Sequence, residues 1–85
     1  MTVRDIRAVA NILAITIAEA GEVPEGHLYV GVMHAGGSLD DFAKIKSLLL
    51  ELGLVTAETG PMLRATQKLV STYQAIQRQG TKGRE

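Results

Sequence analysis

The sequence contains no cysteine and no tryptophan, and its only aromatic residues are Tyr29, Phe42 and Tyr73. The lack of cysteine excludes disulfides, thiolate zinc sites and thiol catalysis, and it fits a reducing compartment, so we expect a cytoplasmic protein. So few aromatic side chains do not make a stacking platform for single-stranded nucleic acid. The sequence also lacks the run of roughly 20 apolar residues that a membrane-spanning helix needs, so we expect no membrane contact.

Net charge is absent as well, because nine Lys and Arg residues balance nine Asp and Glu residues. No overall positive field therefore draws the chain to DNA or to an anionic membrane, and only residues 67–85 are basic as a segment. With 85 residues, 46% of them hydrophobic, the chain is long enough for one small globular domain. Such a domain has little surface to bury, so association with another chain would stabilise it.

Residue patterns that carry catalysis or bind cofactors are missing too. There is no P-loop, no dinucleotide fingerprint and no flanking signature of an activated nucleophile. His27 and His34 lie about 10 Å apart along a predicted helix, too far for one metal ion. The glycine pair 36–37 precedes a helix start, but Asp40 and Asp41 neutralise that positive end, so we interpret the glycines as a turn. The sequence therefore predicts no enzyme activity, cofactor, metal or small-molecule substrate.

A first helix is predicted from Thr2, which suits an N-cap, to Gly21, which suits a C-terminal stop. The apolar residues of its core face are Val3, Ile6, Val9, Ala10, Leu13, Ile17 and Ala20. A second apolar strip, formed by Ala8, Ile12 and Ile15, lies on another side of the helix. This helix is more apolar than one small core needs, so we expect a second copy to cover the strip. Full burial inside the monomer is the alternative.

Two further helices are predicted on either side of the glycine turn. Pro24 suits the first turn of a helix that runs to about His34, and the glycines at 36–37 break it. Ser38 then caps a third helix, with Asp41 completing a shortened capping box. The residues predicted on the buried face of the third helix are Leu39, Phe42, Ile45, Leu48, Leu49 and Leu52.

A β-hairpin is predicted after the third helix. Gly53 ends that helix, and two short apolar strands follow at 54–57 and 62–65 around a turn at 58–61. Thr66 suits the cap of a last helix. The apolar side of the last helix is predicted to carry Leu69, Tyr73 and Ile76, with Val70 beside them.

One domain, residues 1–79, therefore accounts for the predicted elements. Residues 80–85 contain no apolar side chain and are predicted to be a flexible tail. The predicted fold class is mainly α with a small β-hairpin.

The order of these elements resembles the winged helix-turn-helix family, with three helices, a two-stranded wing and a C-terminal helix. The residues that carry the resemblance are Leu49, Leu52-Gly53-Leu54-Val55, Gly60 and Leu63-Arg64-Ala65-Thr66-Gln67-Lys68. The resemblance implies that the third helix is a recognition helix whose first residues meet base edges in a major groove. Those residues are Leu39, Asp40 and Asp41, and the two carboxylates would oppose the DNA phosphates.

Two functions remain open from the sequence. The first is a DNA-binding or regulatory homodimer, with Lys44, Lys46, Arg64 and Lys68 contacting the phosphates of double-stranded DNA. The second is a protein-interaction or oligomerisation module with the same fold and no nucleic-acid role, as the zero net charge and the surplus apolar helix surface indicate. In the first, the first and last helices form the dimer. The residues predicted at that interface are Ala8, Ile12, Ile15, Tyr73 and Ile76.

Overall fold

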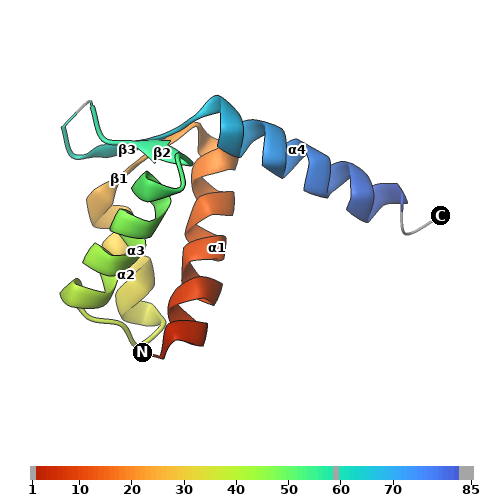
Figure 1. Cartoon of the computed structure of the whole chain (residues 1–85). Helices are drawn as coiled ribbons and strands as arrows, with labels where there is room; N and C mark the ends of the chain where they lie inside the picture. The colour runs from red at the N-terminus through yellow and green to blue at the C-terminus, as the bar shows by residue number, and fades with distance from the viewer. Residues whose placement is uncertain (1, 59, 83–85) are drawn as a thin grey trace.

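A computed structural model describes residues 2–58 and 60–82. In chain order its elements are α1 (Val3–Ala20), β1 (Glu22–Pro24), α2 (Glu25–His34), α3 (Leu39–Glu51), β2 (Val55–Thr56), β3 (Met62–Ala65) and α4 (Gln67–Lys82). Helices α1, α2 and α3 group on one side of the small sheet, and α4 leaves the body near the C-terminal end of α1 (Figure 1). The predicted class, mainly helical with a small antiparallel sheet, is confirmed.

Helix α1 begins and ends where the sequence predicts. The Thr2 hydroxyl accepts from the Asp5 N–H at 3.2 Å, and the Asp5 carboxylate accepts from the Thr2 N–H at 3.2 Å. This reciprocal pair satisfies two backbone donors that have no partner inside the helix. At the other end Gly21 has φ 87°, a conformation that favours glycine, and its N–H donates to the Ile17 carbonyl.

Helix α3 begins with the same device. The Ser38 hydroxyl accepts from the Asp41 N–H at 3.3 Å, and the Asp41 carboxylate accepts from the Ser38 N–H at 2.9 Å. Both halves of the predicted capping box are therefore formed, although aspartate is shorter than the usual glutamate. Helix α3 ends at Glu51, two residues before Gly53, whose φ of 72° turns the chain toward the sheet.

The two capping carboxylates, Asp5 and Asp41, should make the free energy of unfolding depend on pH in the acid range. The backbone N–H of Ser38 lowers the pKa of Asp41 below its ordinary value of 3.8, and the backbone N–H of Thr2 does the same for the pKa of Asp5. A carboxyl with a lowered folded-state pKa contributes stability above its unfolded pKa and loses it as the pH falls through the folded pKa. We therefore expect the free energy of unfolding to fall as the pH drops below about 4. Urea denaturation followed by circular dichroism, repeated along a pH series, measures this.

The matched variants are Asp41→Asn and Asp40→Asn. Asp40 is the exposed neighbour that takes no part in the capping box. Asp41→Asn removes the capping carboxylate, so the free energy of unfolding should depend less on pH below about 4. Asp40→Asn should change this dependence less. An equal acid dependence in the two variants would contradict the role given to Asp41.

The sheet corrects the prediction of a two-stranded wing. Within the described residues it has three antiparallel strands in the order β1-β3-β2. Strand β1 pairs with β3 through Glu22 with Arg64 and Val23 with Leu63. The helix predicted from Pro24 starts at Glu25 instead, because Pro24 ends an edge strand, where its missing N–H costs no ladder hydrogen bond.

Strand β2 is shorter than predicted, covering Val55–Thr56 in place of 54–57. Leu54 stays attached to the end of α3, because its N–H donates to the Leu49 carbonyl at 3.0 Å. Its own carbonyl accepts from the Thr66 N–H at 3.0 Å. The hairpin is therefore tied at its base to both α3 and the start of α4. Thr59, in the predicted turn, lies outside the described residues.

The core lies between α1, α2, α3 and the inner face of the sheet. Its buried side chains are Ala10, Leu13, Ala14, Ile17, Val23, Leu28, Val32, Phe42, Ile45, Leu49, Val55, Leu63 and Leu69. Val3, Ala20, Leu39 and Leu52 were predicted in this core but are exposed. These four residues lie at or beyond the ends of α1 and α3, where their side chains remain exposed. The periodic pattern of apolar residues in a helix does not show how far along the helix other elements cover that face.

Helix α4 is attached to the body only near its start. Leu69 is buried, and Val70 and Tyr73 are partly buried. Beyond Tyr73 the helix extends away from the body (Figure 1), and residues 74–79 are exposed. Helical backbone continues past residue 79 to Lys82, into the segment predicted as a tail. Residues 83–85 of that segment lie outside the described residues.

Candidate interaction surfaces

Two of the four cations predicted to contact DNA are paired with carboxylates of the same chain. The Lys46 ammonium on α3 forms an ion pair with Glu25 at the start of α2, and both side chains are half-buried. Arg64 on β3 lies opposite Glu22 on β1, with Arg64 Nε 3.7 Å from the Glu22 carboxylate. The first pair joins α2 to α3 and the second joins neighbouring strands. Both cations therefore have a structural role within the domain.

The third cation, Lys68, closes the end of α3. Its Nζ donates to the Leu52 carbonyl at 2.7 Å, and the Thr66 hydroxyl donates to the Gly53 carbonyl at 2.6 Å. A lysine suits this position because the last carbonyls of a helix carry partial negative charge and have no partner inside the helix. The first turn of α4 thus caps α3.

The fourth cation, Lys44, faces in a different direction from the others. It is exposed and lines a groove between α3 and α1, whereas Lys46 reaches toward α2 from the opposite side of α3. Arg64 stands on the sheet and Lys68 at the C-terminal end of α3. The structure therefore does not bring the four predicted residues together on one face.

The outer face of α3 carries apolar and acidic side chains. Leu39 and Leu50 are exposed there, with Ala43 between them at helical spacing and Asp40 and Glu51 alongside. The neighbouring carboxylate of Asp41 is used by the capping box. The turn at 57–61 contains no Lys or Arg. Among the described residues, Lys44 is the cation beside this face, because it lines a hollow together with Ala43 and Glu51. A protein held on a phosphate backbone needs several such contacts.

The residues predicted at a dimer interface lie on α1 and α4, and most of them are exposed. On α1, Ile12 is 60% and Ile15 38% exposed, and Ala8 is exposed beside them. These values exclude the alternative that the monomer buries this strip. On α4, Ile76 is 57% exposed. Tyr73 is partly buried because it packs against α1.

Tyr73 joins the start of α4 to the C-terminal end of α1. Its hydroxyl donates to the Glu19 carboxylate at 3.0 Å and accepts from Gln77 at 2.9 Å. Partial burial raises the pKa of Tyr73, and the neighbouring Glu19 raises it further. Glu19 continues the α1 strip at helical spacing after Ile15, and Ile76 follows Tyr73 on the same side of α4. The helices diverge beyond this contact, so α1 and α4 enclose an open angle (Figure 1). We infer that the two strips lie along the sides of that angle, because Glu19 and Tyr73, which join the helices, belong to the same helix sides.

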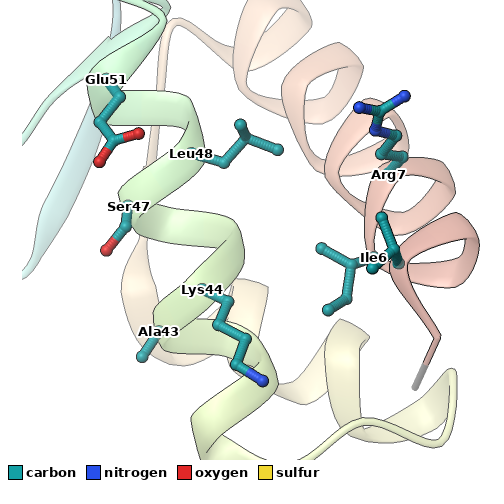
Figure 2. A pocket seen from close by; sticks show the side chains of 8 residues that line it. Ile6, Arg7, Ala43, Lys44, Ser47, Leu48 and Glu51 are labelled. Atoms are coloured by element: carbon teal, nitrogen blue, oxygen red, sulfur yellow. The ribbon is translucent and has the colours of Figure 1, made fainter.

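A groove between α1 and α3 forms a second surface, which the sequence did not predict. A hollow of about 540 Å³ is lined by Val3, Ile6, Arg7, Ala43, Lys44, Ser47, Leu48 and Glu51. A second hollow of about 340 Å³ is lined by Arg7, Ala10, Asn11, Ala14, Leu48, Leu49, Leu52 and Leu54. The two share Arg7 and Leu48. Figure 2 shows Leu48 and Lys44 extending from α3 on the side of α1, whereas the Glu51 side chain lies along α3.

Comparison with protein-family models, with curated proteins and with solved structures finds no match for this chain. Within residues 2–58 and 60–82, no helix combines the length and the apolar character needed to cross a membrane.

Proposed function

We propose that this chain is a winged helix-turn-helix domain that works as a homodimeric protein-interaction module. The proposal rests on the exposed apolar residues of α1 and α4, which share the helix sides of the Tyr73–Glu19 contact. It also rests on the open angle between the two helices (Figure 1). A second copy related by a two-fold axis would place its own α1 and α4 in that angle, because a two-fold interface brings the same patch of both copies together.

The winged-helix assignment is supported by the arrangement of α2 and α3. Four residues, 35–38, separate the two helices, and Gly36 has φ 89°. A short turn containing glycine between two helices is typical of a helix-turn-helix. The hairpin of β2 and β3 follows directly and supplies the wing, with β1 added to its edge.

The geometry of α4 supports a second copy as the occupant. Residues 74–79 lie exposed beyond the contact of Tyr73 with α1. Isolated helices shorter than about 12–15 residues are marginal in water, so this projecting part needs packing to remain helical. An identical copy offers an apolar strip of the same kind, and the zero net charge gives the two copies no overall repulsion.

The double variant Ile12→Glu, Ile15→Glu tests the dimer. Four carboxylates would meet in the assembled interface, and burying unpaired charge there is unfavourable, so we expect a monomer. Sedimentation equilibrium should give the dimer mass for the wild-type chain and the monomer mass for the variant. The control is Val30→Glu, Met33→Glu, which places the same charges on exposed apolar positions of α2 and should leave the dimer intact.

A wild-type chain that sediments as a monomer at high concentration would exclude this proposal. Duplex DNA is the competing partner, and a retardation assay with random duplex separates the two. Binding that falls steeply with added salt would favour the DNA function, because phosphate contacts release counterions. We expect no such binding, since Lys46, Arg64 and Lys68 are engaged within the chain.

A further inference from the structure

We infer that the groove between α1 and α3 binds an acidic amphipathic helix of a partner protein. The groove shares no residue with the α1 strip of Ala8, Ile12 and Ile15, so the inference goes beyond the homodimer and does not rest on it. The inferred ligand, an acidic amphipathic helix, is the class of partner that an interaction module of this kind would bind.

The size and lining of the groove fit a helix. The two hollows meet at Arg7 and Leu48 and follow α1 from Val3 to Ala14. That stretch of helix is about 17 Å long, which matches roughly three turns of a ligand helix. Most of the lining is apolar, with Leu48 reaching toward α1 (Figure 2). A helix that binds in such a groove places apolar anchors at positions i, i+3 or i+4, and i+7.

The charge beside the groove selects an acidic ligand. Arg7 stands on the α1 wall and Lys44 on the α3 wall, and neither forms an ion pair within the part of the chain that the structure describes. Glu51 also lines this hollow, but its side chain lies along α3 and does not reach α1 (Figure 2). Carboxylates flanking the apolar anchors of a ligand would therefore meet two cations, which favours association and fixes orientation.

Arg7 and Lys44 also disfavour two other ligands of the groove, namely a second copy of the chain and nucleic acid. Helix α4 of a second copy contains Lys68, Arg78 and Lys82 and no Asp or Glu, so Arg7 and Lys44 would repel it. Nucleic acid would bring its phosphates to the cations but would leave the apolar lining uncovered, because direct DNA contacts are mostly to phosphate and sugar.

Selection from a phage-displayed library of random peptides, each long enough for about three helical turns, tests this with the full-length chain. We expect enriched peptides to combine apolar residues at helical spacing with Asp or Glu between them. Fluorescence anisotropy of one labelled peptide should show affinity reduced about tenfold or more by the double variant Arg7→Glu, Lys44→Glu. The control Arg4→Glu reverses a charge on the same helix outside both hollows and should change the affinity much less.

A measurement on the unaltered chain checks the location independently. Backbone NMR shifts on titration with the labelled peptide should concentrate on the residues that line the two hollows, such as Ile6, Ala10, Ala14, Leu48 and Leu52. Shifts concentrated on Ile12, Ile15 and Ile76 would overturn the inference, as would an affinity that Arg7→Glu, Lys44→Glu leaves unchanged. Enrichment of basic peptides, or no enrichment at all, would overturn it too. Displacement of the peptide by random duplex DNA would point to nucleic acid as the ligand and count against the inference.

Discussion

Replacing Leu63 with alanine should remove a large part of the stability of the domain. Leu63 is fully buried in the central strand β3, opposite Val23 of β1. A buried leucine truncated to alanine typically costs about 2–5 kcal/mol, because the transfer energy is lost and a cavity remains. A chain of 85 residues has a total of about 4–13 kcal/mol at typical values per residue. Urea denaturation followed by circular dichroism should show a much lower midpoint, or a chain that is partly unfolded without urea.

The control is Leu39→Ala, which makes the same chemical change at another predicted core position. Leu39 is 62% exposed at the start of α3, whereas Leu63 is 0% exposed. A surface substitution away from special features usually changes stability by less than about 0.5 kcal/mol. Similar losses for Leu39→Ala and Leu63→Ala would contradict the described packing, because the two side chains would then be equally buried.

The contrast between these leucines shows how far the sequence predicts the fold. Both follow an apolar pattern, and the pattern does identify the buried faces in the middle of α1 and α3. Thr2, Ser38, Gly21 and Gly53 could be assigned as helix ends because each meets a local backbone requirement. The exposure of Leu39 depends on which element lies beside the first turn of α3, and a local pattern carries no information about that.

Strand β1 was missed for a related reason. Its three residues, Glu22–Pro24, are too few to show alternation, and proline indicates a helix start or a turn as readily as an edge strand. The strand exists because β3 supplies the partner, about forty residues later in the chain. Long-range pairing of this kind cannot be inferred from local propensity.

The cations predicted to contact DNA show the same limitation, because the sequence does not reveal which groups of the chain they pair with. Lys46, Arg64 and Lys68 are predicted DNA contacts because of their placement on the third helix and the wing. Their partners are Glu25, Glu22 and the Leu52 carbonyl, each distant in sequence. The apolar strip of Ala8, Ile12 and Ile15 was predictable, because helical spacing alone separates it from the core face. The groove between α1 and α3 was not, since it needs both helices in place.

A chain that ends at Tyr73 should lose the dimer and keep the folded body. Among the residues whose burial the structure describes, Leu69 is the last buried side chain, and the hydrogen bond from Tyr73 to Glu19 remains, so the core should be intact. The truncated chain lacks Ile76 in both copies of the proposed interface. Burying an isoleucine contributes about 1.5 kcal/mol or more, so two copies contribute about 3 kcal/mol. That corresponds to a dissociation constant about a hundredfold higher, which sedimentation velocity along a concentration series measures.

The matched control is a chain that ends at Gln79, which keeps Tyr73 and Ile76 and should dimerise nearly as well as the full chain. Hydrogen exchange separates assembly from folding in the same samples. In the full-length dimer the amides of residues 74–79 should be protected, because the second copy packs on them and holds them helical. In the monomeric Ile12→Glu, Ile15→Glu variant they should exchange quickly, while the amides around Ile17, Ile45 and Leu63 stay protected. Fast exchange at 74–79 in a full-length chain that still sediments as a dimer would place the interface elsewhere, because α4 would then be unpacked in the assembled protein.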